Sequence, residues 1–184
     1  MNNTFYPADI ISLLRDIEQR SLQSAANATQ LDSFHGTWTA IGFRVAQENL
    51  LIPLNEAREI FIVPTQISPV PHAQPWVFGI ANLRGELLPL FDLKYFLYGQ
   101  ATKVNKRSRI VVTNNAQLYA GLLLDEVFGL KHFQHEPKSE SITSHTPTPI
   151  SPYITGSISQ QDLHWDIFSF NKLIADQRFL NAAA

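Results

Sequence analysis

The spacing of apolar residues changes once along this chain, from a helical period near the start to a strand period afterwards. Apolar side chains recur at intervals of three and four between residues 7 and 27, which predicts an amphipathic helix. Pro7 suits the first turn of that helix, because a first-turn N–H has no helical partner to lose. Polar residues 27–37 indicate a linker, so residues 1–36 are expected to form an appendage.

From residue 38 onward, short runs of alternating apolar and polar residues are separated by Gly, Pro and Asn. This pattern is typical of a β-barrel or a β-sandwich. It predicts ten strands, at residues 39–45, 49–54, 57–63, 76–81, 86–91, 109–113, 118–125, 127–133, 154–159 and 163–168. Short helices are expected at residues 92–98 and 171–179, and the proline-rich segment 136–152 is expected to be a loop without regular structure.

The second five runs repeat the pattern of the first five. A shift of 77 positions places residues 75–79 on residues 152–156, so that a proline, an aromatic residue and a glycine recur in register. A shift of 70 places residues 54–57 on residues 124–127, and the difference of seven equals the extra length of the proline-rich loop. We therefore predict a mainly β domain over residues 37–184, with two similar five-stranded lobes at residues 38–100 and 107–180.

Composition and charge narrow the classes of function. Apolar residues make up 45% of the chain and charged residues 16%, below the average of about 25%, which leaves apolar surface for partners. A net charge of −2 gives no broad attraction to phosphate backbones or anionic lipid, so neither nucleic acid nor a membrane is an expected partner. The absence of cysteine excludes disulfides and cysteine-ligated zinc. With no signal-peptide pattern and no long apolar run, we predict a cytoplasmic protein.

The most specific motif lies between residues 70 and 93. An aromatic run containing Gly79 leads into an Asn-Leu-Arg-Gly turn at residues 82–85, followed by a strand that ends in Asp92. Gly85 can adopt a positive φ, and the Asn82 side chain can bond its own backbone, so Arg84 is predicted at a hairpin tip. Asp92 is expected to cap the helix that follows.

This motif resembles the signature of the CheW family of chemotaxis coupling proteins. Residues 53–60 resemble the family's strand–turn–strand element, residues 121–127 are a third match, and the similarity spans residues 38–175. The preceding helix, residues 41–44 and the pairs 63–64 and 75–76 most resemble the PilI subfamily, which serves the chemosensory system of type IV pili and twitching motility. A general flagellar chemotaxis CheW is the alternative within the family.

The resemblance implies a non-enzymatic adaptor without cofactor or metal, built from two SH3-like five-stranded barrels that share a hydrophobic seam. Its implied partners are the cytoplasmic tip of a methyl-accepting chemoreceptor and the CheW-like regulatory domain of a CheA-type histidine kinase, which would recruit it to membrane-bound receptor arrays. The contact residues carried over by motif position are Arg84, Glu59, Ala57, Asn82, Gly85, Gly79 and Val127. Because residues 160–162 lack the Arg-Gly turn, the two lobes are not expected to bind equivalent surfaces.

Each singled-out residue also has a purely structural interpretation. Arg84 could be an ordinary solvated charge, since most exposed charges contribute little. Gly79 follows an aromatic strand where a backbone bends or is approached closely, so a structural role is favoured. Trp76 and Tyr153 are expected in a core between the lobes, and Trp165 is expected to be a core residue.

The sequence gives little support for metal binding or for nucleic-acid binding. His132 and His135 are three apart, which on a strand directs their side chains to opposite faces, so no metal site is expected there. A β-barrel that binds single-stranded nucleic acid is a hypothesis from another class of function. Its support is weak, because the sequence has a single basic cluster, at Lys103, Lys106 and Arg107.

A hydrolase is a third hypothesis. Asp162 and His164 lie near Ser157 and Ser159, which supplies the residue types of a catalytic triad. No Gly-x-Ser-x-Gly nucleophile elbow is present, and neighbours on one strand are not expected to converge on a substrate. We therefore predict no catalytic residues.

Overall fold

A computed structural model describes residues 38–116, 118–138, 149–160 and 163–182. The chain divides into two compact units, Met1–Thr37 and Trp38–Ala184. The helix predicted for residues 7–27 lies outside the described residues. No helix in the described part of the chain is long and apolar enough to cross a membrane.

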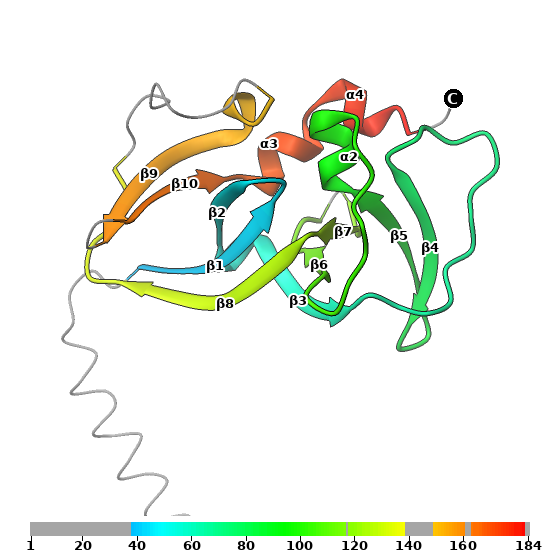
Figure 1. Ribbon diagram of the computed structural model, residues 1–184, viewed down its shortest axis with the longest axis horizontal. Helices are drawn as coiled ribbons and strands as arrows, with labels where there is room; N and C mark the ends of the chain where they lie inside the picture. The colour runs from blue at the N-terminus through cyan, green and yellow to red at the C-terminus, as the bar shows by residue number, and fades with distance from the viewer. Residues whose placement is uncertain (1–37, 117, 139–148, 161–162, 183–184) are drawn as a thin grey trace, which may run out of the picture. The chain divides into compact units, whose positions relative to one another are not determined.

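The second unit is a mainly β fold of two five-stranded sheets, as predicted (Figure 1). Sheet A has the order β8 (Glu126–Phe133), β1 (Trp38–Val45), β2 (Glu48–Pro53), β10 (Leu163–Phe168) and β9 (Ile154–Gln160). Sheet B has the order β3 (Ala57–Ile62), β6 (Arg109–Thr113), β7 (Gly121–Leu124), β5 (Glu86–Asp92) and β4 (Val77–Leu83). Every predicted strand is present, with ends shifted by three residues or fewer.

Short helices follow the last strand of each repeat, which also confirms the prediction. Helix α2 (Leu93–Tyr98) follows β5, and α3 (Phe170–Ile174) with α4 (Gln177–Leu180) follows β10. Asp92 caps α2 as expected, because its side chain accepts a hydrogen bond from the backbone N–H of Tyr95. One detail differs: the 3-10 helices η1 (Leu54–Glu56) and η2 (Ser151–Tyr153) were not predicted, and η2 lies at the end of the expected proline-rich loop.

The two sheets do not follow the two halves of the sequence. Sheet A combines the first two strands of the first repeat with the last three strands of the second repeat. Sheet B combines the first two strands of the second repeat with the last three strands of the first. The contiguous lobes expected at residues 38–100 and 107–180 are therefore corrected to lobes that exchange strands. Alternation along a strand reports which face is buried, but it does not identify the neighbouring strand, so the exchange left no signal in the pattern.

The pairing register supports the internal repeat. The parallel pair of Leu51 with Ile167 in sheet A corresponds to the pair of Gly121 with Leu90 in sheet B under the shifts of 70 and 77. The isolated bridges obey the same shifts, since Ser68 pairs with Ile80 and Lys138 pairs with Ser157. The two repeats therefore adopt one topology with their first two strands exchanged.

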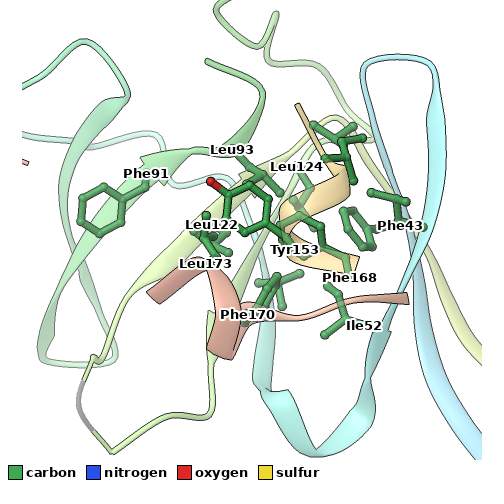
Figure 2. Packing of buried hydrophobic residues seen from close by; sticks show 14 of the residues in the cluster. Phe43, Ile52, Phe91, Leu93, Leu122, Leu124, Tyr153, Phe168, Phe170 and Leu173 are labelled. Carbon is green, nitrogen blue, oxygen red and sulfur yellow. The ribbon is translucent and has the colours of Figure 1, made fainter. Parts of the chain in front are cut away.

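Three apolar clusters account for the core. One fills the interior of sheet A, one fills the interior of sheet B, and the largest contains side chains from both sheets and from the helices. Figure 2 shows this shared cluster, in which Tyr153 and Phe168 lie among residues of both repeats. Trp76 packs against the shared cluster and Trp165 lies in the interior of sheet A, so the expected core positions are confirmed. The exchanged strands thus bury a common seam.

Candidate functional site

The β4–β5 hairpin ends in a two-residue turn that displays Arg84. Arg84 and Gly85 have φ values of 53° and 89°, a combination typical of a type I′ turn. The Asn82 side-chain oxygen accepts a hydrogen bond of 2.9 Å from the Gly85 backbone N–H. The positive φ at Arg84 costs about 1 kcal/mol or more, and the strand pairing and the Asn82 hydrogen bond hold the backbone in this conformation.

Arg84 joins the two edges of sheet B. Its Nη1 lies 2.9 Å from Oε2 of Glu59 on β3, and its guanidinium carbon lies 5.2 Å from the centre of the Phe61 ring. Strands β3 and β4 are opposite edges of the sheet, so these contacts require the sheet to curl. The Arg84 side chain still keeps 73% of its surface exposed, which leaves its other donors open to a partner carboxylate.

A different contact joins the two edges of sheet A. There the Gln160 side-chain amide donates a hydrogen bond of 3.1 Å to the backbone carbonyl of His132. This contact between β9 and β8 is neutral, whereas the contact between the edges of sheet B is an ion pair. The residue equivalent to Arg84 under the shift of 77 lies outside the described residues, so different binding surfaces for the two lobes stay a prediction.

Exposed apolar side chains lie on the strands around the Arg84 turn. Leu87, the cross-strand neighbour of Asn82, is 71% exposed. Ile62 at the end of β3 is 76% exposed, but it alternates with Glu59 and Phe61, the residues that contact Arg84, and pairs with Arg109 instead. An aliphatic side chain as exposed as Leu87, on the same hairpin as an exposed arginine, is typical of a protein-binding surface.

Gly79 lies away from the turn, at the other end of β4. Its φ is 141°, and an added Cβ would lie 2.7 Å from the Ser68 carbonyl oxygen and 2.5 Å from Cγ2 of Ile67. Ser68 cannot retreat easily, because it exchanges two backbone hydrogen bonds with Ile80. Gly79 therefore permits the close approach of a second segment, which is the structural role that the sequence favoured. It also lines an apolar cleft of about 290 Å³.

Ala57 and Val127 are also separate from the turn. Ala57 begins β3 and pairs with Thr113, and Val127 lies in β8 and pairs with Phe43. The two residues are 70 positions apart, so they are equivalent in the repeat, and both pack against the shared core cluster. The structure thus gathers Arg84, Glu59, Asn82 and Gly85 at one tip and places Gly79, Ala57 and Val127 elsewhere.

The triad residues considered from the sequence form surface contacts. The Ser159 hydroxyl lies 3.2 Å from Nδ1 of His164, and Nε2 of His164 lies 3.2 Å from the Asp166 carboxylate. Ser159 and His164 are exposed cross-strand neighbours on β9 and β10. Asp162, the acidic residue that the sequence analysis considered, lies outside the described residues. The carboxylate that contacts His164 belongs to Asp166 instead. No group of three metal-ligating side chains occurs in the part of the chain that the structure describes.

A polar network between buried Tyr153 and two residues near the C-terminus was not predicted from the sequence. The Tyr153 hydroxyl donates to Asp176 at 2.5 Å and accepts from Arg178 at 2.7 Å. Burial and the hydrogen bond to Asp176 raise the pKa of Tyr153 to about 12. The hydrogen bond from Arg178 lowers the pKa of Asp176 to about 2. This network ties η2 to α4 across the shared core.

Replacing Tyr153 with phenylalanine is expected to lower the free energy of unfolding by about 1 kcal/mol at neutral pH, since one hydroxyl is lost from the network. A tyrosine in the unfolded chain releases its proton near pH 10, whereas folded Tyr153 holds it to about pH 12. The contribution of protonated Tyr153 to the free energy of unfolding is therefore complete below about pH 10 and is lost as the pH rises through about 12. Ionised Asp176 contributes to the free energy of unfolding in acid solution. This contribution is complete above about pH 4 and is lost as the pH falls through about 2.

Urea unfolding between about pH 9 and 12 checks this expectation. The phenylalanine variant should lose stability less steeply across that range than the parent. Tyr98→Phe should flatten the alkaline slope as well, because burial and Glu48 also raise the pKa of Tyr98 to about 12, and it shows the size of the effect for a tyrosine outside the network. Equal alkaline slopes in the parent and in the Tyr153 variant would rule out the proposed role of the hydroxyl.

Comparison with known proteins gives one family match, two similar proteins and one similar structure. Residues 39–178 match the CheW-like domain family. The chain is 34% identical to Protein PilI of Pseudomonas aeruginosa over 171 residues, which covers 93% of this chain and 94% of that protein. It is 29% identical over 133 residues to the chemotaxis protein CheW of Helicobacter pylori, covering 71% and 79% of the two chains. The crystal structure of the scaffolding protein TtCheW from Thermoanaerobacter tengcongensis superposes with a TM-score of 0.58 at 24% identity, over 71% of this chain and 88% of that one.

Proposed function

This chain belongs to the CheW-like family, and on that premise we propose that it is a non-enzymatic adaptor that couples a methyl-accepting chemoreceptor to a CheA-type histidine kinase. The observation that carries the proposal is the Arg84 turn, where a strained hairpin and an ion pair to Glu59 hold an exposed guanidinium beside exposed Leu87. Holding such a group in place removes part of the entropic cost of binding. The site offers a rigid recognition surface rather than reactive groups.

Six of the seven contact residues divide between two proposed surfaces, and Gly79 lies outside both, where it permits the close approach of Ser68. Arg84, Glu59, Asn82 and Gly85 form the turn, which suits a partner carboxylate, because arginine can hold a carboxylate with two parallel hydrogen bonds. Ala57 and Val127 occupy equivalent positions against the shared core and suit a second contact along the seam. Two separate surfaces are what an adaptor with two partners requires.

We further propose that the adaptor serves the chemosensory system of type IV pili and twitching motility. The similarity to PilI supports this branch, because it extends over 93% of the chain, whereas the similarity to the Helicobacter CheW covers 71%. In this role the protein would work in the cytoplasm and be recruited to receptor arrays at the membrane. A flagellar chemotaxis system is the alternative setting for the same coupling.

Reconstitution of the phosphorylation reaction tests the proposal. The kinase and receptor from the same genome are mixed with and without this chain, and the rate of kinase autophosphorylation is measured. We expect the receptor to change the rate only when the chain is present, while the chain alone has no effect without the receptor. A rate that responds to the receptor equally well without the chain would contradict coupling.

A further inference from the structure

The connection between α2 and β6 concentrates positive charge in a chain whose net charge is −2. Residues 93–124 contain five of the 14 lysines and arginines and no acidic residue. Four of those cations lie within seven positions, at Lys103, Lys106, Arg107 and Arg109. The first three are exposed and Arg109 is half-buried. We call these four residues, with Val104 and Ile62, the basic surface; Figure 1 shows its loop as the green segment between α2 and β6.

The loop that carries the basic surface is held by its own hydrogen bonds. Buried Thr102 anchors one end, with its N–H and hydroxyl both donating to Asp92, at 2.7 and 2.8 Å. At the other end the Asn105 side chain accepts from the Arg107 N–H at 2.8 Å, and the Asn105 N–H donates to the Ser108 hydroxyl at 3.0 Å. The cations are therefore displayed from an ordered turn, which reduces the entropy lost when a ligand binds.

Little of the charge on this surface is neutralised within the molecule. Arg107 has one ion pair at 3.6 Å, with Glu126, which also pairs with Arg44. Among the described residues, no carboxylate lies within ion-pair distance of Lys103 or Lys106. Both lysines are exposed, and no carboxylate of residues 38–116, 118–138, 149–160 or 163–182 compensates their charge.

Aliphatic side chains lie between these cations. Val104 is 48% exposed in the middle of the loop, and Ile62 is 76% exposed on β3. Ile62 is the direct cross-strand partner of Arg109, so an exposed apolar side chain lies next to a basic one. Alternating apolar and cationic groups match a ligand that has both acidic and apolar side chains.

We propose that the basic surface docks an acidic segment of a partner protein, with glutamates or aspartates on the lysines and an aliphatic side chain on Val104 and Ile62. This function lies beyond the coupling proposed above, because none of the seven contact residues belongs to the basic surface. A protein ligand fits better than nucleic acid, because the exposed side chains between the cations are aliphatic, whereas single strands are bound by stacking on aromatic ones. It also fits better than lipid, because the net charge of the whole chain opposes a broad anionic surface.

Fluorescence anisotropy with the full chain tests the proposal. The probe is a short labelled peptide with the repeat Glu-Glu-Leu, and a Lys-Lys-Leu peptide of equal length is the charge control. We expect the acidic peptide to bind, to lose affinity by roughly tenfold or more with Lys103→Glu and Lys106→Glu combined, and to dissociate near 1 M salt, where the screening length falls to about 3 Å. The single reversals Lys103→Glu and Lys106→Glu are each compared with Lys138→Glu, which makes the same charge change at an exposed position bridged to β9 and should leave affinity within about twofold.

Each remaining outcome counts for or against the proposal. Lys103→Gln with Lys106→Gln should give an intermediate loss and serves if the charge-reversed chain unfolds early in a thermal scan. Equal losses with Lys138→Glu would overturn the proposal in favour of general charge attraction. Tighter binding to phosphatidylglycerol vesicles or to an oligothymidine strand than to the acidic peptide would overturn it in favour of lipid or nucleic acid. None of these readouts uses the kinase or the receptor, so failure here leaves the coupling proposal standing.

Discussion

Replacing Phe168 with alanine is expected to lower the free energy of unfolding by about 3 to 5 kcal/mol, the largest effect we foresee for a single substitution in this chain. Phe168 is fully buried at the seam, with ring centres 5.5 Å from Tyr153, 6.0 Å from Phe43 and 6.1 Å from Phe170. These neighbours come from both repeats, so the cavity left by truncation cannot close by the collapse of one sheet. A loss of this size is a large part of the 5 to 15 kcal/mol that stabilises an ordinary domain.

Urea denaturation followed by tryptophan fluorescence measures the effect. Leu163→Ala is the matched control, because Leu163 lies on the same strand but is 60% exposed, and it should cost less than about 0.5 kcal/mol. A single transition at lower urea is expected for Phe168→Ala, since both sheets depend on the shared cluster. Two separate transitions in the parent protein would show that the seam does not unite the lobes.

Replacing Arg84 with alanine is expected to weaken binding of the kinase or the receptor by about 1 to 3 kcal/mol, a loss of roughly 5-fold to 150-fold in affinity. The reason is the removal of an exposed guanidinium that can donate two parallel hydrogen bonds to a partner carboxylate. Folding should be little affected, because an exposed ion pair such as that with Glu59 contributes at most about 1 kcal/mol. Isothermal titration calorimetry with each partner gives the affinities.

Two further variants separate binding from folding at this turn. Arg84→Gly removes the same side chain but relaxes the positive φ of 53°, so stability should hold or rise while binding still falls. Arg84→Glu combined with Glu59→Arg keeps an ion pair across the sheet edges but reverses its polarity. If that double variant binds both partners as well as the parent does, the turn is a structural clasp and the guanidinium contacts no partner.

The sequence was informative where one strand or one turn decides the outcome. Strands such as β3 were located by alternation, because they separate a buried face from a more exposed one, whereas β6 and β7 are buried on both faces and were located as short apolar runs between turn residues. The Asn-Leu-Arg-Gly sequence located the Arg84 tip because a two-residue hairpin needs positive φ values that Asn and Gly favour locally. The repeat shifts also indicated that Ala57 and Val127 are equivalent, since register is conserved between the two copies.

Contacts that depend on tertiary curvature could not be predicted. Arg84 and Glu59 meet because sheet B curls until its opposite edges touch, and no local pattern encodes that curl. The exchange of strands between the sheets could not be predicted either, because β3 has the same alternation of apolar and polar residues whether it pairs with β2 or with β6. The Tyr153 network was missed because its members lie on separate short elements, and Asp176 there also caps α4.

Co-sedimentation of the kinase with receptor-containing membranes tests the central claim most directly. The account predicts that the kinase pellets with the membranes when this chain is added, that it stays in the supernatant without the chain, and that Arg84→Gly reduces the pelleted fraction while remaining folded. A kinase that pellets to the same extent without the chain, or that stays in solution when the folded chain and both partners are present, would contradict a bridging adaptor.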